Sequence, residues 1–248
     1  MTKAKQALIV WGGWLGHEPE QVAAIFRDVL ESEGFAVEVS DTLQSFADAE
    51  KLKRLDLIVP VWTMGQIEQE LARNVSAAVQ SGVGLAGCHG GMCDAFRTNV
   101  DWQFMTGGQW VAHPGNDGVE YTVRIKRSSS PILQGIDDFT VKTEQYYLHV
   151  DPAVEVLATT RFPVVPGPHS LNKAVDMPVV WTKRWGVGRV YYCSLGHKAD
   201  IIDMPQVKLM MRRGFLWAAE GKRFAEAEQA AANGAGAAGY TGMADSQQ

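Results

Sequence analysis

The sequence predicts an α/β fold built on a doubly wound, mostly parallel β-sheet. Over the first hundred residues, four short and almost continuously apolar runs alternate with segments whose apolar residues recur every three to four positions. Continuous apolar runs are typical of strands buried on both faces, and their alternation with helices is typical of parallel βαβ units. The overall composition, 46% hydrophobic and 21% charged, is that of an ordinary globular protein.

The first strand is predicted over residues 7–11, because this run is apolar throughout and Gly12 and Gly13 end it. Pro19 then begins a helix that ends near Gly34. Five apolar residues fall on one face of this helix: Val22, Ile25, Phe26, Val29 and Leu30.

Three more strands are predicted at 35–39, 57–62 and 83–88, with a helix over 67–78 before the last of them. The third strand contains Pro60, which has no N–H to donate to a neighbouring strand. We therefore expect Pro60 near a strand end or at a bulge.

From residue 100 to 177 the pattern loosens into long loops with short strand-like pieces at 119–125 and 154–158. The core pattern returns at 177–182 and 188–195, and a helix follows Pro205. We therefore expect one α/β domain over residues 1–222 and an Ala/Gly-rich tail over 223–248. The composition of the tail is typical of a flexible segment, and packing on a neighbouring subunit, which would make the protein a homo-oligomer, is the alternative.

The charge and composition exclude several classes of protein. The net charge is −5 and no basic patch is evident, so we expect no nucleic-acid partner. No apolar run approaches the ~20 residues of a membrane helix, and the N-terminus lacks the apolar core of a signal peptide, which favours the cytoplasm. The three cysteines form no CxxC pair, so neither a disulfide framework nor a cysteine zinc site is expected.

The segment Gly87-Cys88-His89-Gly90-Gly91 follows a predicted buried strand and precedes a predicted helix. Small residues around a central side chain are typical of a tight strand-to-helix turn that exposes this side chain above the sheet. The central residue is His89, and we expect it to be exposed at the sheet edge where α/β proteins bind ligands. Cys88 is expected to point to the opposite face, because adjacent residues of a strand alternate.

A second histidine, His197, comes just past the predicted strand at 188–195. The triad histidine of class I glutamine amidotransferases has this position, and the chain resembles that fold with His89 in place of the nucleophilic cysteine. Several segments in this order also resemble the trehalose-utilisation (ThuA-like) family over about residues 5–220. They are 82–91, 102–108, 111–114, 143–147 with 151–152 and 156–158, and 178–182 leading into 186–197.

This resemblance implies a flavodoxin-like, class I glutamine amidotransferase-like fold with long inserted loops, and a role in disaccharide catabolism. Family members often occur beside a dehydrogenase that makes 3-keto glycosides. We therefore expect an enzyme that acts on a keto-glycoside or a related sugar. A base would take the proton next to the ketone, and the outcome would be isomerisation or elimination. The candidate catalytic residues are His89, His197 and Glu144.

Neutral imidazole is the commonest metal ligand, so a divalent metal, zinc or manganese, is a further expectation; no nucleotide cofactor is expected. The candidate ligands are four histidines, with Glu144 as an additional candidate: His17, His89, His149 and His197. Side chains with aromatic faces or polar tips are expected to bind a small sugar substrate. These are Trp14, Trp62, His113, Tyr146 and Tyr147.

Two alternatives remain open from the residues. The first is a cysteine-dependent, amidotransferase-like hydrolase that uses Cys88 or Cys93. The second is a non-catalytic module that binds sugar or supports assembly.

Overall fold

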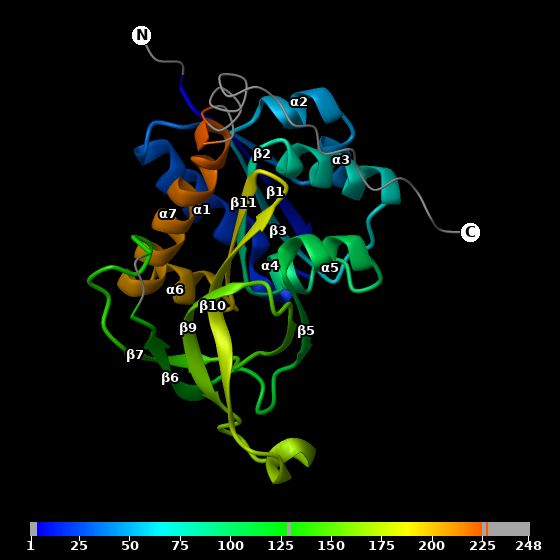
Figure 1. Cartoon of the computed structure of the whole chain (residues 1–248). Helices are drawn as coiled ribbons and strands as arrows, with labels where there is room; N and C mark the ends of the chain where they lie inside the picture. Colours follow the sequence, from blue (N-terminus) through cyan, green and yellow to red (C-terminus); the bar gives the residue numbers. More distant parts are fainter. Residues whose placement is uncertain (1–3, 128–129, 225–226, 228–248) are drawn as a thin grey trace, which may run out of the picture.

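Residues 4–127, 130–224 and 227 are described by a computed structural model. Among them, nine strands form one twisted sheet in the order β2-β1-β3-β4-β11-β10-β9-β6-β7 (Figure 1). The strands are β1 (Gln6–Gly13), β2 (Ala36–Ser40), β3 (Leu57–Thr63), β4 (Gly84–Cys88), β6 (Val119–Ile125), β7 (Phe139–Thr143), β9 (Glu155–Phe162), β10 (Val175–Trp185) and β11 (Gly188–Cys193). A second, two-stranded sheet pairs β5 (Gly108–Ala112) with β8 (Tyr147–Val150).

The first five strands in this order are parallel, and the other four extend the sheet in antiparallel fashion. The predicted α/β class and the parallel βαβ part of the sheet are confirmed. Between residues 100 and 177, the predicted strand-like pieces at 119–125 and 154–158 form β6 and the first part of β9, whereas β5, β7 and β8 lie where long loops were expected. Most of the strands of this region are short and exposed on one face. Half-buried antiparallel strands alternate polar and apolar residues, so residues 100–177 have only a weak apolar pattern.

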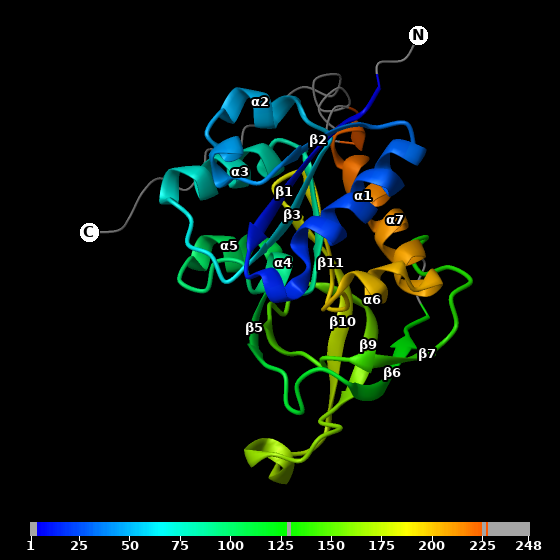
Figure 2. The same cartoon turned by 180° about the vertical axis from the view of Figure 1, so that it is seen from behind.

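Helices cover both faces of the parallel part of the sheet (Figures 1 and 2). One face carries α1 (Pro19–Ser32), α6 (Ala199–Asp203) and α7 (Pro205–Ala219), and the other carries α2 (Ala49–Arg54), α3 (Gln69–Gln80), α4 (His89–Cys93) and α5 (Val100–Thr106). Alternate residues of β1 enter the two cores: Ala7 and Ile9 pack with α1 and α7, and Leu8 and Val10 pack with α3. This accounts for the continuous apolar run. None of the helices in the described ranges has both the length and the apolar character needed to span a bilayer.

Contrary to our expectation of a strand end or a bulge, Pro60 lies in the middle of β3, in unbroken register with β1. The pairing of β3 with β4 ends at Ile58, so Pro60 has a paired neighbour only on the β1 side. The missing N–H therefore costs no hydrogen bond to β4. The expectation that the tail packs on a neighbouring subunit concerns residues 223–248, nearly all of which lie outside the described ranges.

Candidate functional site

A cleft of about 330 Å³ opens at the carboxyl ends of the parallel strands. α/β sheets bind ligands at this edge, next to the position where the strand order reverses. Here this position lies between β1 and β3. The cleft is lined by Trp110 of β5 and by residues that follow β1, β3, β4, β5, β7 and β11: Trp14, His17, Met64, Asp94, Arg97, His113, Asn116, Asp117, Glu144, Tyr146 and His197. Its volume is within the range of small-molecule sites.

The predicted turn at His89 is present, and its backbone has the strained geometry of such a turn. His89 has a φ of +48°, which a non-glycine residue rarely adopts. Contrary to our expectation, its side chain is buried, with only 1% of the residue exposed. The ring of Tyr146 stacks on it at 3.9 Å, and its Nδ1 lies 2.8 Å from the Ser194 carbonyl oxygen. A carbonyl only accepts hydrogen bonds, so this contact assigns a proton to Nδ1 and directs Nε2 toward the site.

Four buried residues converge beneath the cleft: His17, His89, Glu144 and His197. One potential ligand atom of each lies within 4.8 Å of those of the others. The Glu144 carboxylate is central, because its Oε2 lies 3.1 Å from His89 Nε2 and 3.3 Å from His197 Nδ1. The residues come from four distant parts of the chain, after β1, β4, β7 and β11. We call them the His₃Glu cluster.

Neighbouring backbone and side chains fix the loops that carry the cluster. His17 ends the 3₁₀ turn η1 (Leu15–His17), and its Nδ1 lies 2.9 Å from Thr63 Oγ1 at the end of β3. The next residue, Glu18, accepts a hydrogen bond of 3.0 Å from the backbone N–H of Ala199. This contact joins the loop that carries His17 to the loop that carries His197.

The electrostatic environment keeps His17 and His89 neutral and the glutamate ionised. Burial, followed by the proximity of His89 and His197, lowers the pKa of His17 to about 3. Burial also lowers the pKa of His89, although Glu144 opposes this effect. Burial alone would raise the pKa of Glu144, but the imidazoles of His197 and His89 hold it below its usual range. Three imidazoles around a carboxylate form a ligand set suited to a divalent cation.

The depressed pKa of His17 predicts a loss of stability in acid. The unfolded chain binds a proton at His17 below pH 6.5, whereas the folded site does so only near pH 3. The free energy of unfolding should therefore fall as the pH drops from 6.5 toward 3, by about 1.4 kcal/mol per pH unit for this one proton. Urea unfolding in the presence of a chelator, over this pH range, measures the slope.

The variant His17→Gln should have a shallower acid slope than the wild type. His149→Gln, which changes an exposed histidine, is the matched control and should keep the wild-type slope. Equal slopes in His17→Gln and the wild type would contradict this prediction.

Three of the residues predicted for the site lie elsewhere. His149 lies in β8, opposite Gln109, and borders a separate shallow hollow with Phe104; Glu144 thus takes the place expected for His149 in the ligand set. The half-buried ring of Trp62 packs against Gly12 and Gly65 and is not among the described residues of the cleft lining. Tyr147 packs against Phe162, on the side opposite to that of Tyr146, because successive residues of an extended chain point in opposite directions.

The sequence prediction missed an ion pair in the cleft wall. Arg97 binds Asp94 through two hydrogen bonds of 2.6 and 2.8 Å, and Asp94 is buried. The guanidinium lies 4.4 Å from the ring centre of Trp110, whose ring is 5.3 Å from that of His113. Asp94 and Arg97 lie three residues apart in the turn after α4, a spacing that does not show that the pair faces a cleft.

The geometry does not favour a cysteine nucleophile. All three cysteines are buried, and within the described part of the chain none of them lines the cleft. Burial raises the pKa of Cys88 well above its usual range and that of Cys193 to about 12. Thiols in such surroundings are protonated and unreactive at neutral pH.

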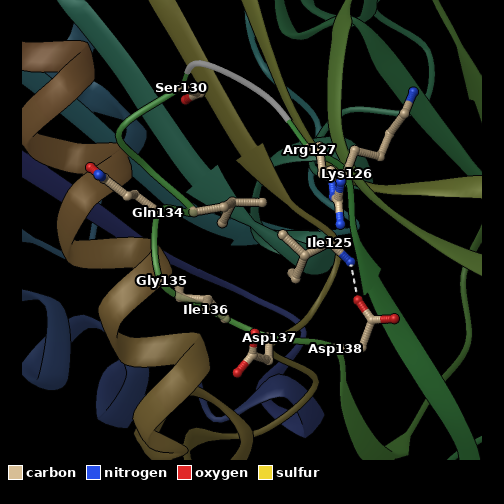
Figure 3. Close-up of a pocket in the computed structure, with 10 residues that line it drawn as sticks. Ile125, Lys126, Arg127, Ser130, Gln134, Gly135, Ile136, Asp137 and Asp138 are labelled. Carbon is tan, nitrogen blue, oxygen red and sulfur yellow. Dashed lines mark hydrogen bonds between the residues drawn. The ribbon is translucent and has the colours of Figure 1, made fainter.

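A second cavity, of about 450 Å³, lies where the chain passes from β6 to β7 (Figure 3). Figure 3 shows Asp138 turned back toward Ile125, whose backbone N–H donates to the Asp138 carboxylate at 2.7 Å. The described lining of this cavity contains neither histidine nor aromatic residues. We therefore take the cleft above the His₃Glu cluster as the candidate functional site.

Comparisons with known proteins agree with this architecture. Two solved structures described as putative ThuA-like proteins are similar. That of Bacteroides uniformis has a TM-score of 0.70 and 19% identity over 88% of this chain and 93% of its own. That of Parabacteroides merdae has a TM-score of 0.69 and 17% identity over 89% and 91%. None of the curated proteins matches the chain.

A β-galactosidase from Bacillus circulans is similar in fold only. Its TM-score is 0.54, with 13% identity over 89% of this chain and 31% of its own. The family model described as ThuA, trehalose utilisation, matches residues 6–218. This match spans most of the chain, including every residue of the cleft. The chain belongs to the ThuA, trehalose-utilisation family.

Proposed function

We propose that this protein is a carbohydrate-catabolism enzyme that removes the proton next to the ketone of a keto-glycoside with the help of a divalent cation. The observation that carries the proposal is the convergence of four potential ligand atoms within 4.8 Å of one another under a cleft of sugar size. Membership of the trehalose-utilisation family supports a carbohydrate as the substrate.

The protonation pattern of the His₃Glu cluster fits a cation. When His89 is neutral, its Nε2 and the Glu144 Oε2, 3.1 Å apart, are both hydrogen-bond acceptors and repel each other. His197 Nδ1 is buried and has no hydrogen-bond partner among the described residues, although it lies 3.3 Å from the same oxygen. A positive ion resolves both conflicts. His17, His89, His197 and Glu144 would hold zinc or manganese, which would act as a Lewis acid toward a substrate oxygen.

In this proposal His113 takes the proton. His89 Nε2 and His197 Nδ1 face Glu144, and His197 Nε2 lies 3.7 Å from Asp117, so in this proposal these two histidines act as ligands. The side chain of His113 lines the cleft outside the cluster and is 29% exposed. Its Nε2 lies 3.7 Å from Glu144 Oε1, whereas the contacts of His89 and His197 are with Oε2. Proton transfer by a positioned imidazole typically contributes about 10²- to 10⁴-fold to a rate.

For a ketone at C3, the reaction would begin with transfer of the C2 proton to His113. The electron pair of the C2–H bond is delocalised onto the C3 oxygen. Transfer of the proton from His113 to C3, with loss of the O2–H proton, moves the ketone to C2 and gives an isomer. Departure of the C1 substituent with its bonding electrons gives a C1–C2 double bond. The cleft allows either outcome, so the proposal covers an isomerase and a lyase.

Deuterium exchange tests the proposal directly. The metal-loaded protein should exchange the C2 proton of a 3-keto glucoside in D₂O, and the chelated protein should not, while both remain folded by circular dichroism. NMR follows the exchange, and elemental analysis gives the metal content. Binding of the sugar without exchange, in the metal-loaded protein, would instead favour a non-catalytic sugar-binding module and overturn the proposal.

A further inference from the structure

Three tryptophans predicted near the ligand edge differ in whether their rings are accessible. Trp62 is half-buried, with its ring against Gly12 and Gly65, and it is not among the described residues that line the cleft. Trp110 has the Arg97 guanidinium 4.4 Å from its ring centre and the ring of His113 at 5.3 Å. Trp14 lines the cleft and is 46% exposed. Of the three, Trp14 is the most exposed, and it lines the cleft.

Trp14 and Met64 form one apolar wall at the mouth of the cleft. Their backbones are adjacent, because Trp14 N–H donates to the Thr63 carbonyl at 3.0 Å, and Met64 is 43% exposed. Two local features keep this wall in place. The ring of Trp14 lies so close to Gly16 that a Cβ there would be 2.3 Å from it, and Met64 has the strained φ of +54°. Strain of this kind persists where the surrounding structure enforces it, and it is concentrated at functional sites.

The cleft changes character from floor to mouth. The His₃Glu cluster at the floor is buried and polar, whereas the mouth has the apolar wall and, among its other lining residues, the polar Asn116 and Asp117. A sugar that reacts at the floor must point its C1 substituent outward, toward the mouth. A ring with an apolar face and polar edges fits between such surfaces.

We infer that Trp14 and Met64 form a subsite for a ring-shaped leaving group of the glycoside, stacked on the Trp14 indole. This inference rests on the proposed function for the position of the reacting sugar. An aryl group and a second pyranose share the required chemistry, an apolar ring face. The polar side chain of Asn116 offers hydrogen bonds that only the pyranose hydroxyls would use.

Calorimetric binding of three glucosides of the same anomeric configuration tests the subsite: methyl glucoside, phenyl glucoside and a glucosyl-glucose. The wild-type protein should bind at least one of the two ring-bearing ligands about five- to tenfold more tightly than methyl glucoside. Trp14→Ala should lose this preference while binding methyl glucoside as before. Leu15→Ala is the matched control, since Leu15 is 74% exposed and adjacent but does not line the cleft.

An equal preference in Trp14→Ala and the wild type, or no preference in the wild type, would overturn the inference. Asn116→Gly identifies the ring, and glycine tolerates the φ of +56° at this position. If Asn116→Gly binds glucosyl-glucose more weakly than the wild type does but binds phenyl glucoside equally well, the leaving group is a pyranose. If phenyl glucoside is the preferred ligand and Asn116→Gly binds both ligands as the wild type does, the leaving group is an aryl group. These measurements involve no turnover, so a protein that prefers rings but does not exchange the C2 proton would refute the proposed function and leave the subsite standing.

Discussion

Glu144→Gln is expected to lower the affinity for a divalent cation by about 100-fold or more and to abolish exchange of the C2 proton. Changing even an outer partner of a metal ligand typically costs about 10- to 100-fold in affinity, and Glu144 is the one anionic member of the His₃Glu cluster. Glutamine has nearly the same shape, so the packing of His89 and His197 around position 144 is retained. Competition with a chromophoric chelator measures the affinity.

The control for this change is Glu70→Gln, which removes the same charge from an exposed position on α3, outside the cleft. It should bind the cation as the wild type does. The chelated forms of both variants should unfold near the wild-type temperature, which separates loss of the cation from loss of the fold. Wild-type cation affinity in Glu144→Gln would show that the cluster is not the metal site.

The positions of His17, His89 and His197 at one edge could be predicted because they follow directly from strand order. Each comes shortly after the carboxyl end of a buried parallel strand, and these ends meet at one edge of such a sheet. The tight turn at His89 was also predictable, since Gly87 and Gly90 flank it. Its burial was not, because the covering ring of Tyr146 comes from a segment 57 residues away, whose path depends on the β7-to-β8 connection.

The residues between 100 and 177 were harder to place. His149 and Tyr147 lie in β8, whose pairing with β5 in a separate sheet turns them away from the cleft. Successive side chains of a strand point to opposite faces, so the sequence predicts that neighbours such as Tyr146 and Tyr147 point apart. It does not predict which of them faces the site, because this depends on the pairing register of the strand. The pairing of Arg97 with Asp94 was visible as spacing, but its contact with Trp110 joins two segments whose proximity only the fold determines.

His113→Ala is expected to reduce C2-proton exchange by about 100-fold or more while the cation remains bound at full stoichiometry. The imidazole of His113 lies in the cleft wall, between the ring of Trp110 at 5.3 Å and Glu144 Oε1 at 3.7 Å. It is therefore close to the cation ligands without being one of them. This separation of metal content from exchange distinguishes a proton acceptor from a ligand, since loss of a ligand would lower both.

His149→Ala is the matched control for this variant, because it removes an imidazole that borders a different hollow, and its exchange rate should equal that of the wild type. The truncation of His113 leaves a space that opens to the cleft, so added imidazole should restore part of the exchange. Rescue should be strongest for small imidazoles, because the cleft measures about 330 Å³ and must also hold the sugar. If His113→Ala exchanged the C2 proton at the wild-type rate, the proton acceptor would have to be sought within the cluster itself, with Glu144 Oε1 as the nearest group.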